Sequence, residues 1–266
     1  MTRRNSRLIL LVPAFLIFFT YVYAQPPKPR AEPLTVGETL TYEGKLSKSI
    51  LRGISVADLS FKVVKSSDNR GYLIKTEARS KGTLTKWFGF TFQQIFESSV
   101  EAENFRILKT VKHDEQGDRV RNSEAVFDYD DKRVTYVETD PNDPMRPPRR
   151  IASQIEDETH DLVSAIYSLR LLPLTVGKTF YVMVSDSGLV YKVPVHVAAR
   201  ERQNSVLGKV WCFRLEPEVF GANRIINQEG KMTIWITDDE RRLPIRSRID
   251  SSIGKVEVKL KKIETQ

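Results

Sequence analysis

The sequence predicts a mostly β protein, built as one large curved antiparallel sheet or open half-barrel with one central amphipathic helix. Apolar residues alternate with polar residues along most of the chain, which is typical of strands that bury one face. Clusters of Asp, Asn, Ser and Gly separate these segments at intervals of about ten residues, as expected for turns between short strands. One segment, at residues 161–172, has its apolar residues at helical spacing instead.

Residues 1–24 have the layout of a secretory signal peptide. Arg3, Arg4 and Arg7 precede an apolar run, and Ala24 is a small residue before the predicted cleavage point. The apolar run is shorter than the about 20 residues that a membrane-spanning helix needs. We therefore expect export to the periplasm or the extracellular space, with retention as an N-terminal membrane anchor as the alternative.

A proline-rich tether at residues 25–33 follows this leader. Residues 34–266 are long enough for a single β-rich domain. A second reading divides that domain into two β-halves, 34–139 and 174–266, joined by a proline-rich loop and a helix at 157–172.

A short repeat supports the division into halves without requiring it. The phrase Leu34-Thr35-Val36-Gly37 recurs as Leu174-Thr175-Val176-Gly177, and in both places a glycine turn precedes an expected strand. The repeat marks either two related halves or one local turn used twice.

The strand that begins at Leu189 has six apolar residues at alternate positions, and Pro194 lies on its other face. Proline has no backbone N–H to donate to a neighbouring strand. We therefore expect this strand to lie at a sheet edge or to contain a bulge.

The predicted helix has a broad apolar stripe, made of Leu162, Val163, Ala165, Ile166, Tyr167 and Leu169. Asp157 and Thr159 are candidate N-caps, and Pro173 ends the helix.

Charge and cysteine content limit the possible partners. The formal net charge is +8, and it falls to about +5 without the three arginines of the leader. This mild excess fits contact with an anionic membrane or sugar surface, or no partner at all. No basic run with interleaved aromatic residues indicates nucleic-acid binding. A single cysteine, Cys212, excludes an intrachain disulfide, and its apolar neighbours predict a buried thiol.

No catalytic, metal or cofactor motif is found in the sequence. His113, His160 and His196 are not at metal-ligand spacing, and we expect His113 to be exposed and His160 to make a surface or capping contact. The acidic clusters at residues 128–131 and 238–240 fit hairpin turns better than calcium loops. The sequence has neither a nucleophile elbow nor a phosphate-binding glycine loop. We therefore expect a protein that is not an enzyme and needs no cofactor.

Residues 87–92 place large apolar side chains on both faces of one segment, with Trp87 opposite Phe90. Such a segment is either packed in a core or lines a cavity on one face. One hypothesis is a protein that binds a lipid or another amphiphile inside the curved sheet, with Trp87, Phe90, Ile166 and Tyr167 near the cavity. The alternative is an interaction module that pairs with another envelope protein through an exposed edge strand near Pro194.

Four phrases in order resemble the exported bacterial family known as domain of unknown function 3108 (DUF3108). They are Val36-Gly37-Glu38-Thr39-Leu40-Thr41-Tyr42, Asp161-Leu162-Val163-Ser164-Ala165-Ile166-Tyr167-Ser168-Leu169-Arg170, Leu174-Thr175-Val176-Gly177 and Ile234-Trp235-Ile236-Thr237-Asp238-Asp239, the last followed by Arg242-Leu243-Pro244-Ile245. The resemblance implies export and a β-rich fold, but no activity. The expected architecture is also loosely similar to the periplasmic lipoprotein carriers, whose open half-barrel encloses a helix over an apolar cavity; this likeness concerns the fold only.

Overall fold

The computed structural model describes residues 34–49, 51–67, 71–83, 86, 89–252 and 254–265. The predicted signal peptide (residues 1–24), the tether (residues 25–33) and Trp87 lie outside the described residues. The strands are β1 (Thr39–Lys48), β2 (Leu51–Lys65), β3 (Gly71–Ser80), β4 (Phe92–Glu101), β5 (Ile107–Gln116), β6 (Arg119–Asp128), β7 (Arg133–Thr139), β8 (Arg149–Gln154), β9 (Thr159–Asp161), β10 (Thr179–Asp186), β11 (Leu189–Ser205), β12 (Gly208–Pro217), β13 (Gly230–Thr237), β14 (Pro244–Ser251) and β15 (Gly254–Glu264). Helix α2 (Leu162–Ser168) continues into a 3₁₀ turn, η1 (Leu169–Leu171).

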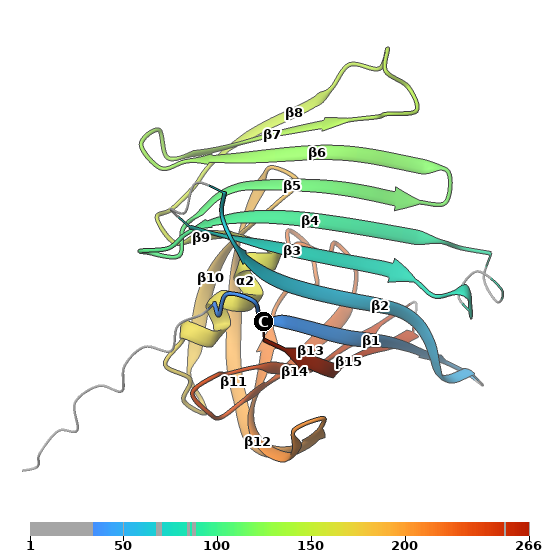
Figure 1. Ribbon diagram of the computed structural model, residues 1–266, viewed down its shortest axis with the longest axis vertical. Coiled ribbons are helices and arrows are strands. Elements are labelled where there is room, and N and C mark those ends of the chain that lie inside the picture. The colour runs from blue at the N-terminus through green and yellow to red at the C-terminus, as the bar shows by residue number, and fades with distance from the viewer. Residues whose placement is uncertain are drawn as a thin grey trace, which may run out of the picture. The chain divides into compact units, whose positions relative to one another are not determined.

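The fifteen strands form one open sheet in the order β8-β7-β6-β5-β4-β3-β2-β1-β15-β14-β13-β12-β11-β10-β9. Neighbours along the chain are neighbours in the sheet, except that β8 and β9 lie at its opposite ends. The two halves of this order are joined where β1 pairs antiparallel with β15, seen in Figure 1 as the blue strand beside the dark red one. The free edges are β8 and β9, which are consecutive in sequence. This sheet, together with helix α2, confirms the predicted fold class.

The sheet curls around α2. The helix contacts β3 and β4 on one side and β9 and β10 on the other, although these pairs lie far apart in the sheet order. Asp161 caps the helix by accepting a hydrogen bond from the backbone N–H of Ser164 at 2.6 Å. Its second carboxylate oxygen accepts hydrogen bonds from Ser98 on β4 and from Thr110 on β5, the latter at 2.7 Å. One buried side chain therefore both starts the helix and attaches it to the opposite strands.

A buried ion pair fixes the other end of the helical segment. Arg170 donates to both carboxylate oxygens of Glu38, at 2.7 and 3.3 Å, and its Nε donates to the carbonyl of Arg241 at 3.0 Å. The two side chains are 2% and 7% exposed. Arg242 donates to the carbonyl of Leu172 at 2.9 Å. The segment after α2 is thus bound to the start of β1 and to the β13–β14 loop.

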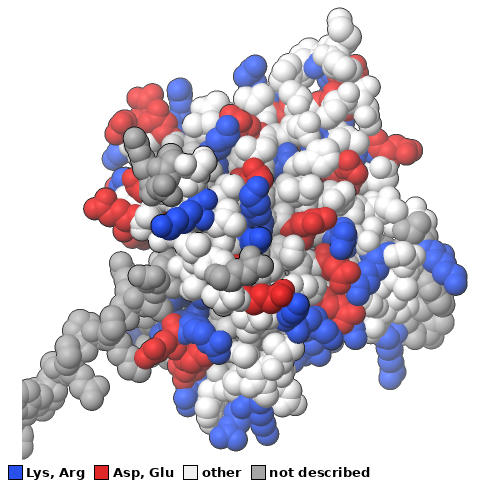
Figure 2. All heavy atoms as spheres, viewed as in Figure 1, with Lys and Arg blue, Asp and Glu red and all other residues white. Residues whose placement is uncertain are grey.

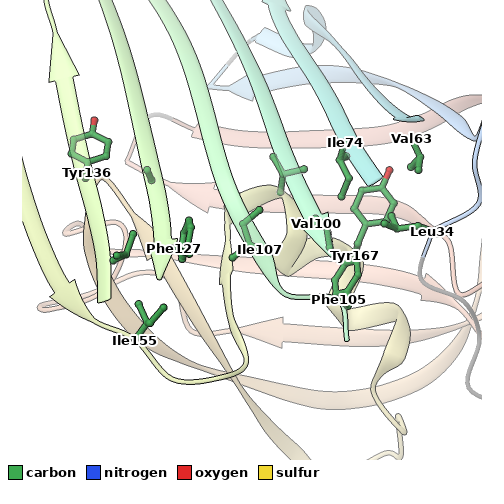
Figure 3. Close-up of a cluster of buried hydrophobic side chains, with 13 residues drawn as sticks. Leu34, Val63, Ile74, Val100, Phe105, Ile107, Phe127, Tyr136, Ile155 and Tyr167 are labelled. Atoms are coloured by element: carbon green, nitrogen blue, oxygen red, sulfur yellow. The ribbon is translucent and has the colours of Figure 1, made fainter. Parts of the chain in front are cut away.

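The helix separates two apolar clusters. Val163 and Tyr167 belong to a cluster under β2–β7, in which Figure 3 shows Tyr167 next to Leu34. Leu169 belongs to a second cluster under β10–β13. Because the helix packs against strands on both sides, its buried surface is wider than a single stripe.

The repeated phrase forms the same turn twice. Gly37 and Gly177 have φ angles of 83° and 86°, in the left-handed region that favours glycine. The N–H of Gly37 donates to Val63 of β2 at 2.9 Å, and that of Gly177 donates to Val197 of β11 at 2.8 Å. Each turn therefore binds the start of one strand to its hairpin partner, near the end of β2 in the first copy and in the middle of β11 in the second.

One of the two alternatives expected for the Pro194 strand is confirmed, and the expected helix cap needs correction. Pro194 is not in an edge strand, because β11 lies between β10 and β12; the expected bulge occurs between Val197 and Ala199. Pro194 pairs with Tyr181 of β10, whereas β12 pairs with β11 only from Val195 onward. Proline is therefore tolerated at this position, because the strand pairing with β12 does not extend to it. The helix N-cap is Asp161, and neither Asp157 nor Thr159 caps it, because the chain is still extended through β9.

Charged side chains are mixed on the surface. On the face shown in Figure 2, acidic and basic residues are interspersed over the strands. Ion pairs join neighbouring strands, for example Lys75 with Glu97 at 2.8 Å and Lys109 with Glu124 at 2.7 Å. The basic excess of the sequence is therefore not gathered into one patch on that face.

We predict that Glu38→Gln lowers the free energy of unfolding by about 3–5 kcal/mol, because the charge of Arg170 would remain buried without its partner. Urea unfolding followed by tryptophan fluorescence measures this change. The control is Glu97→Gln in the exposed pair with Lys75, for which we expect a loss of about 1 kcal/mol or less. Equal losses in the two variants would contradict a structural role for the buried pair.

Gly188, in the β10–β11 turn, lies against the far edge of the sheet. Its φ is +81°, and a Cβ atom there would come within 2.6 Å of Tyr136 Cβ and 2.9 Å of Ile151 Cβ. Ser153 of β8 donates to the carbonyl of Gly188 at 2.7 Å. Side-chain contacts thus hold β8 near the β10–β11 hairpin, although no strand pairing between them is seen in the described part of the chain.

We predict that Gly188→Ala destabilises the protein by about 3 kcal/mol, from backbone strain and overpacking together. Gly177→Ala is the matched control, since Gly177 has a similar φ of +86° but nothing within 4 Å of an added Cβ. It should cost only about 1 kcal/mol. Thermal unfolding compares the two, and a similar loss in both would mean that the contact with β7 and β8 is unimportant.

Candidate functional site

An apolar cavity of about 230 Å³ lies between the helical segment and the middle of the sheet. It spans five adjacent strands, β2, β1, β15, β14 and β13, and is partly open to solvent. The lining residues are Leu40, Tyr42, Leu59, Phe61, Ile166, Tyr167, Arg170, Met232, Ile234, Pro244, Arg246, Ser247, Ile249 and Val258. An apolar cavity of about 150 Å³ already suffices to bind a molecule such as benzene. The site is therefore large enough for an organic ligand.

The aromatic wall of the cavity is built by contacts between β1, β2 and α2. The ring of Phe61 packs edge-on against Tyr42, with 5.6 Å between the ring centroids, and at a tilt against Tyr167, with 6.5 Å between them. Burial raises the pKa of Tyr42 and of Tyr167 well above the usual value for tyrosine. Both phenols therefore stay neutral at physiological pH.

The two arginines that line the cavity are already paired. Arg170 binds Glu38, as described above, and Arg246 pairs with Glu257 and donates to Gln203 at 2.9 Å. The Arg170 guanidinium also lies 5.5 Å from the centre of the Tyr167 ring. The cavity is thus apolar, with its nearby charges balanced.

Two of the four predicted site residues, Ile166 and Tyr167, line this cavity. Phe90 is 42% exposed in the β3–β4 connection and contacts the Phe92 ring at 6.3 Å; it is not among the lining residues. Trp87 lies outside the described residues.

Sequence reasoning missed the part of the lining that comes from β13, β14 and β15. The alternation in β1 and β2 indicated inward-facing side chains such as Leu40, Tyr42 and Phe61. Nothing in the local sequence indicates that they face Ile234 and Val258, because this depends on the pairing of β1 with β15.

A second, smaller hollow of about 40 Å³ has a mixed polar and apolar lining and lies between β4–β7 and the β9–β10 region. Asp161 and Asp186 are among its lining residues. Burial raises the pKa of the Asp186 carboxyl. This hollow has room for about one or two water molecules, so it is a weaker candidate for a ligand site.

The three histidines do not form a metal site. Among the described residues no group of three or more His, Cys, Asp or Glu side chains could hold a metal ion. His113 is partly exposed and bonds to Asn122 and Glu115. His160 differs from the expected surface or capping contact, since Asp161 provides the cap and the imidazole packs on Phe105 with its Nδ1 atom buried.

Cys212 and the acidic clusters have structural roles. Cys212 is fully buried, and burial raises its pKa to about 12, so the thiol is unreactive. Asp128 accepts hydrogen bonds from the backbone N–H groups of Asp130 and Asp131, and Asp239 accepts one from that of Arg242. These bonds confirm the turn interpretation of both clusters.

The profile of a protein family of unknown function, DUF3108, matches residues 39–261. The chain belongs to the DUF3108 family. This confirms the resemblance seen in the sequence, and the family has no assigned activity. No curated protein matches the chain.

Two solved structures were found to be similar to this DUF3108 member. A β-barrel-like protein of the DUF1849 family from Brucella abortus is 10% identical, with 87% of this chain and 98% of that chain covered and a TM-score of 0.57. A protein from Bacteroides fragilis with a YmcC-like fold is also 10% identical, with coverage of 88% and 98% and a TM-score of 0.33. The first of these supports the β-barrel-like architecture and no particular function. Within the described ranges, no helix has the length and apolar character required to cross a membrane.

The burial of His160 predicts a pH-dependent stability. Burial lowers its pKa from 6.5 to about 4, against the opposing effect of Asp161. Between about pH 6.5 and pH 4, the unfolded chain binds a proton that the folded chain does not. The free energy of unfolding should therefore fall by about 3 kcal/mol as the pH is lowered through this window.

We predict that His160→Phe reduces this loss, as measured by thermal unfolding at a series of pH values. His113→Gln is the control, for which the effect on stability has the opposite sign. Hydrogen bonds to Asn122, the larger effect, and to Glu115 raise the pKa of His113, so its protonation favours the folded state. A pH profile that is unchanged in His160→Phe would show that other groups cause the loss.

Proposed function

We propose that this protein binds an apolar or amphiphilic molecule of the lipid type in the cavity under α2, and that it acts in the cell envelope as a binding protein and not as an enzyme. The observation that supports this most directly is the cavity itself. It is partly open, and most of its lining side chains are aliphatic or aromatic. Apolar surface of this kind gains about 25 cal/mol for each Å² that a ligand removes from water.

The architecture favours the same proposal. The helix covers one side of the cavity and the sheet covers the other, as in other ligand-holding curved sheets. The predicted signal peptide at residues 1–24 would deliver the protein to the envelope, where lipids are abundant.

The test is native mass spectrometry of the chain expressed from its own N-terminus, exported and purified without detergent, followed by organic extraction. We expect a reproducible excess mass that extracts as lipid, on a polypeptide that has lost residues 1–24. A bare polypeptide mass and an empty extract would contradict the proposed function. An intact N-terminus would contradict cleavage after Ala24. It would not affect the conclusion on ligand binding, which depends only on the excess mass.

We predict that Ile166→Trp removes the excess mass, because the larger side chain would fill the cavity from the helix side. Val111→Trp is the matched control, since Val111 lies on β5, is 39% exposed and does not line the cavity. Circular dichroism should show that both variants are folded. Retention of the lipid in folded Ile166→Trp would place the ligand elsewhere.

A further inference from the structure

The hydroxyl group of Tyr167 is a buried polar group within an otherwise apolar wall. Tyr167 lines the cavity and is 2% exposed. Its Oη atom is buried, and none of the described residues provides it with a hydrogen-bond partner. Leaving such a group without a partner costs about 1–3 kcal/mol, so it indicates that something else bonds there.

A second tyrosine in the same wall shows the contrast. Tyr42 donates its hydroxyl proton to the carbonyl of Pro244 at 2.8 Å. The phenol of Tyr42 is therefore satisfied by the protein, whereas that of Tyr167 remains able to donate one hydrogen bond to a bound molecule.

The charges around the cavity disfavour an anionic ligand. The three donor nitrogens of Arg170 are directed at the Glu38 carboxylate and at the carbonyl of Arg241. Arg246, the other lining arginine, has its charge paired with Glu257 and donates to Gln203, and only its buried Nε has no partner among the described residues. A carboxylate or phosphate placed here would lose its hydration without gaining an unpaired cation, and it would be repelled by Glu38.

We infer that the cavity selects an uncharged molecule with an apolar chain and a hydrogen-bond acceptor, such as an ester carbonyl, which accepts the proton of Tyr167 Oη. This inference rests on the proposed function, because it specifies the ligand class of the same cavity. An ester of a membrane lipid and a free fatty ester share this chemistry.

The experiment uses the full chain after removal of any bound lipid, with a fluorescent apolar probe, phenylnaphthylamine, displaced by three competitors. These are methyl decanoate, tridecane as an apolar molecule with the same number of non-hydrogen atoms, and ionised decanoate at mildly alkaline pH. In the wild-type protein we expect methyl decanoate to bind roughly fivefold to tenfold more tightly than tridecane, as one net hydrogen bond would provide. Decanoate should bind more weakly than its methyl ester.

In Tyr167→Phe, we expect the preference for the ester over tridecane to disappear, while tridecane binds as in the wild type. The thermal stability of Tyr167→Phe should be equal or higher, because the variant removes a buried hydroxyl that has no partner. Tyr129→Phe is the matched control. Tyr129 does not line the cavity and donates to the carbonyl of Ile107 at 3.0 Å, so this variant should lose stability and keep the ester preference.

The outcomes separate the two claims. If the wild type binds neither probe nor tridecane, the proposed function fails and this inference fails with it. If tridecane binds but Tyr167→Phe retains the ester preference, the cavity is real and the role of Tyr167 is overturned. Decanoate that binds as tightly as its methyl ester would overturn the selection for an uncharged ligand.

To distinguish the two ester sources, extracts of the exported protein are compared for intact phospholipids and free fatty esters. Either of them supports the inference, and a free fatty acid alone contradicts it.

Discussion

The buried ion pair between Arg170 and Glu38 determines where the helical segment lies on the sheet. Removing both charges from water is costly, so the pair is useful only when each group is fully bonded, as the additional bond from Arg170 to the Arg241 carbonyl ensures. This arrangement places Ile166, Tyr167 and Arg170 across the cavity from residues of β1 and β15. As a consequence, Ile166 and Tyr167 form one wall of the cavity. The opposite charges of Arg170 and Glu38 cancel each other, so the cavity wall formed by Ile166 and Tyr167 remains suitable for an apolar ligand.

The two copies of the repeated turn show how tertiary structure gives different roles to equal local structure. Both turns have the same glycine conformation and the same hydrogen bonds to the neighbouring strand. In one copy the residue after the glycine is Glu38, which is buried against the helical segment; in the other it is Lys178, which is exposed. The backbone geometry follows from four residues of sequence, whereas the burial of the fifth depends on a helix that is far away in the chain.

Much of the fold could be predicted from local sequence, and the site could be predicted only in part. Alternation gave the strands, and the spacing around Ile166 gave the helix, because both patterns reflect which face of an element is buried. Pro194 indicated an edge strand or a bulge without deciding between them, because a missing N–H can be accommodated at an edge and also where one partner strand ends. His160 was misread because a neighbouring side chain, Phe105, comes from a distant segment. The part of the cavity lining that comes from β13, β14 and β15 depends on the pairing of β1 with β15. These strands are at the two ends of the domain, and no local pattern in the sequence indicates that they pair.

The pairing of β1 with β15 also has a consequence for how the chain folds. Contacts of such large separation along the sequence are formed late and slowly, because closing the intervening loop costs entropy before any contact repays it. Strand β1 is synthesised before β15, so one of its two edges stays unpaired until β15 has been made. Until then, its backbone N–H and C=O groups are open to pairing with another chain. The N-terminal strand is therefore the part of the nascent chain for which protection by a chaperone would matter most.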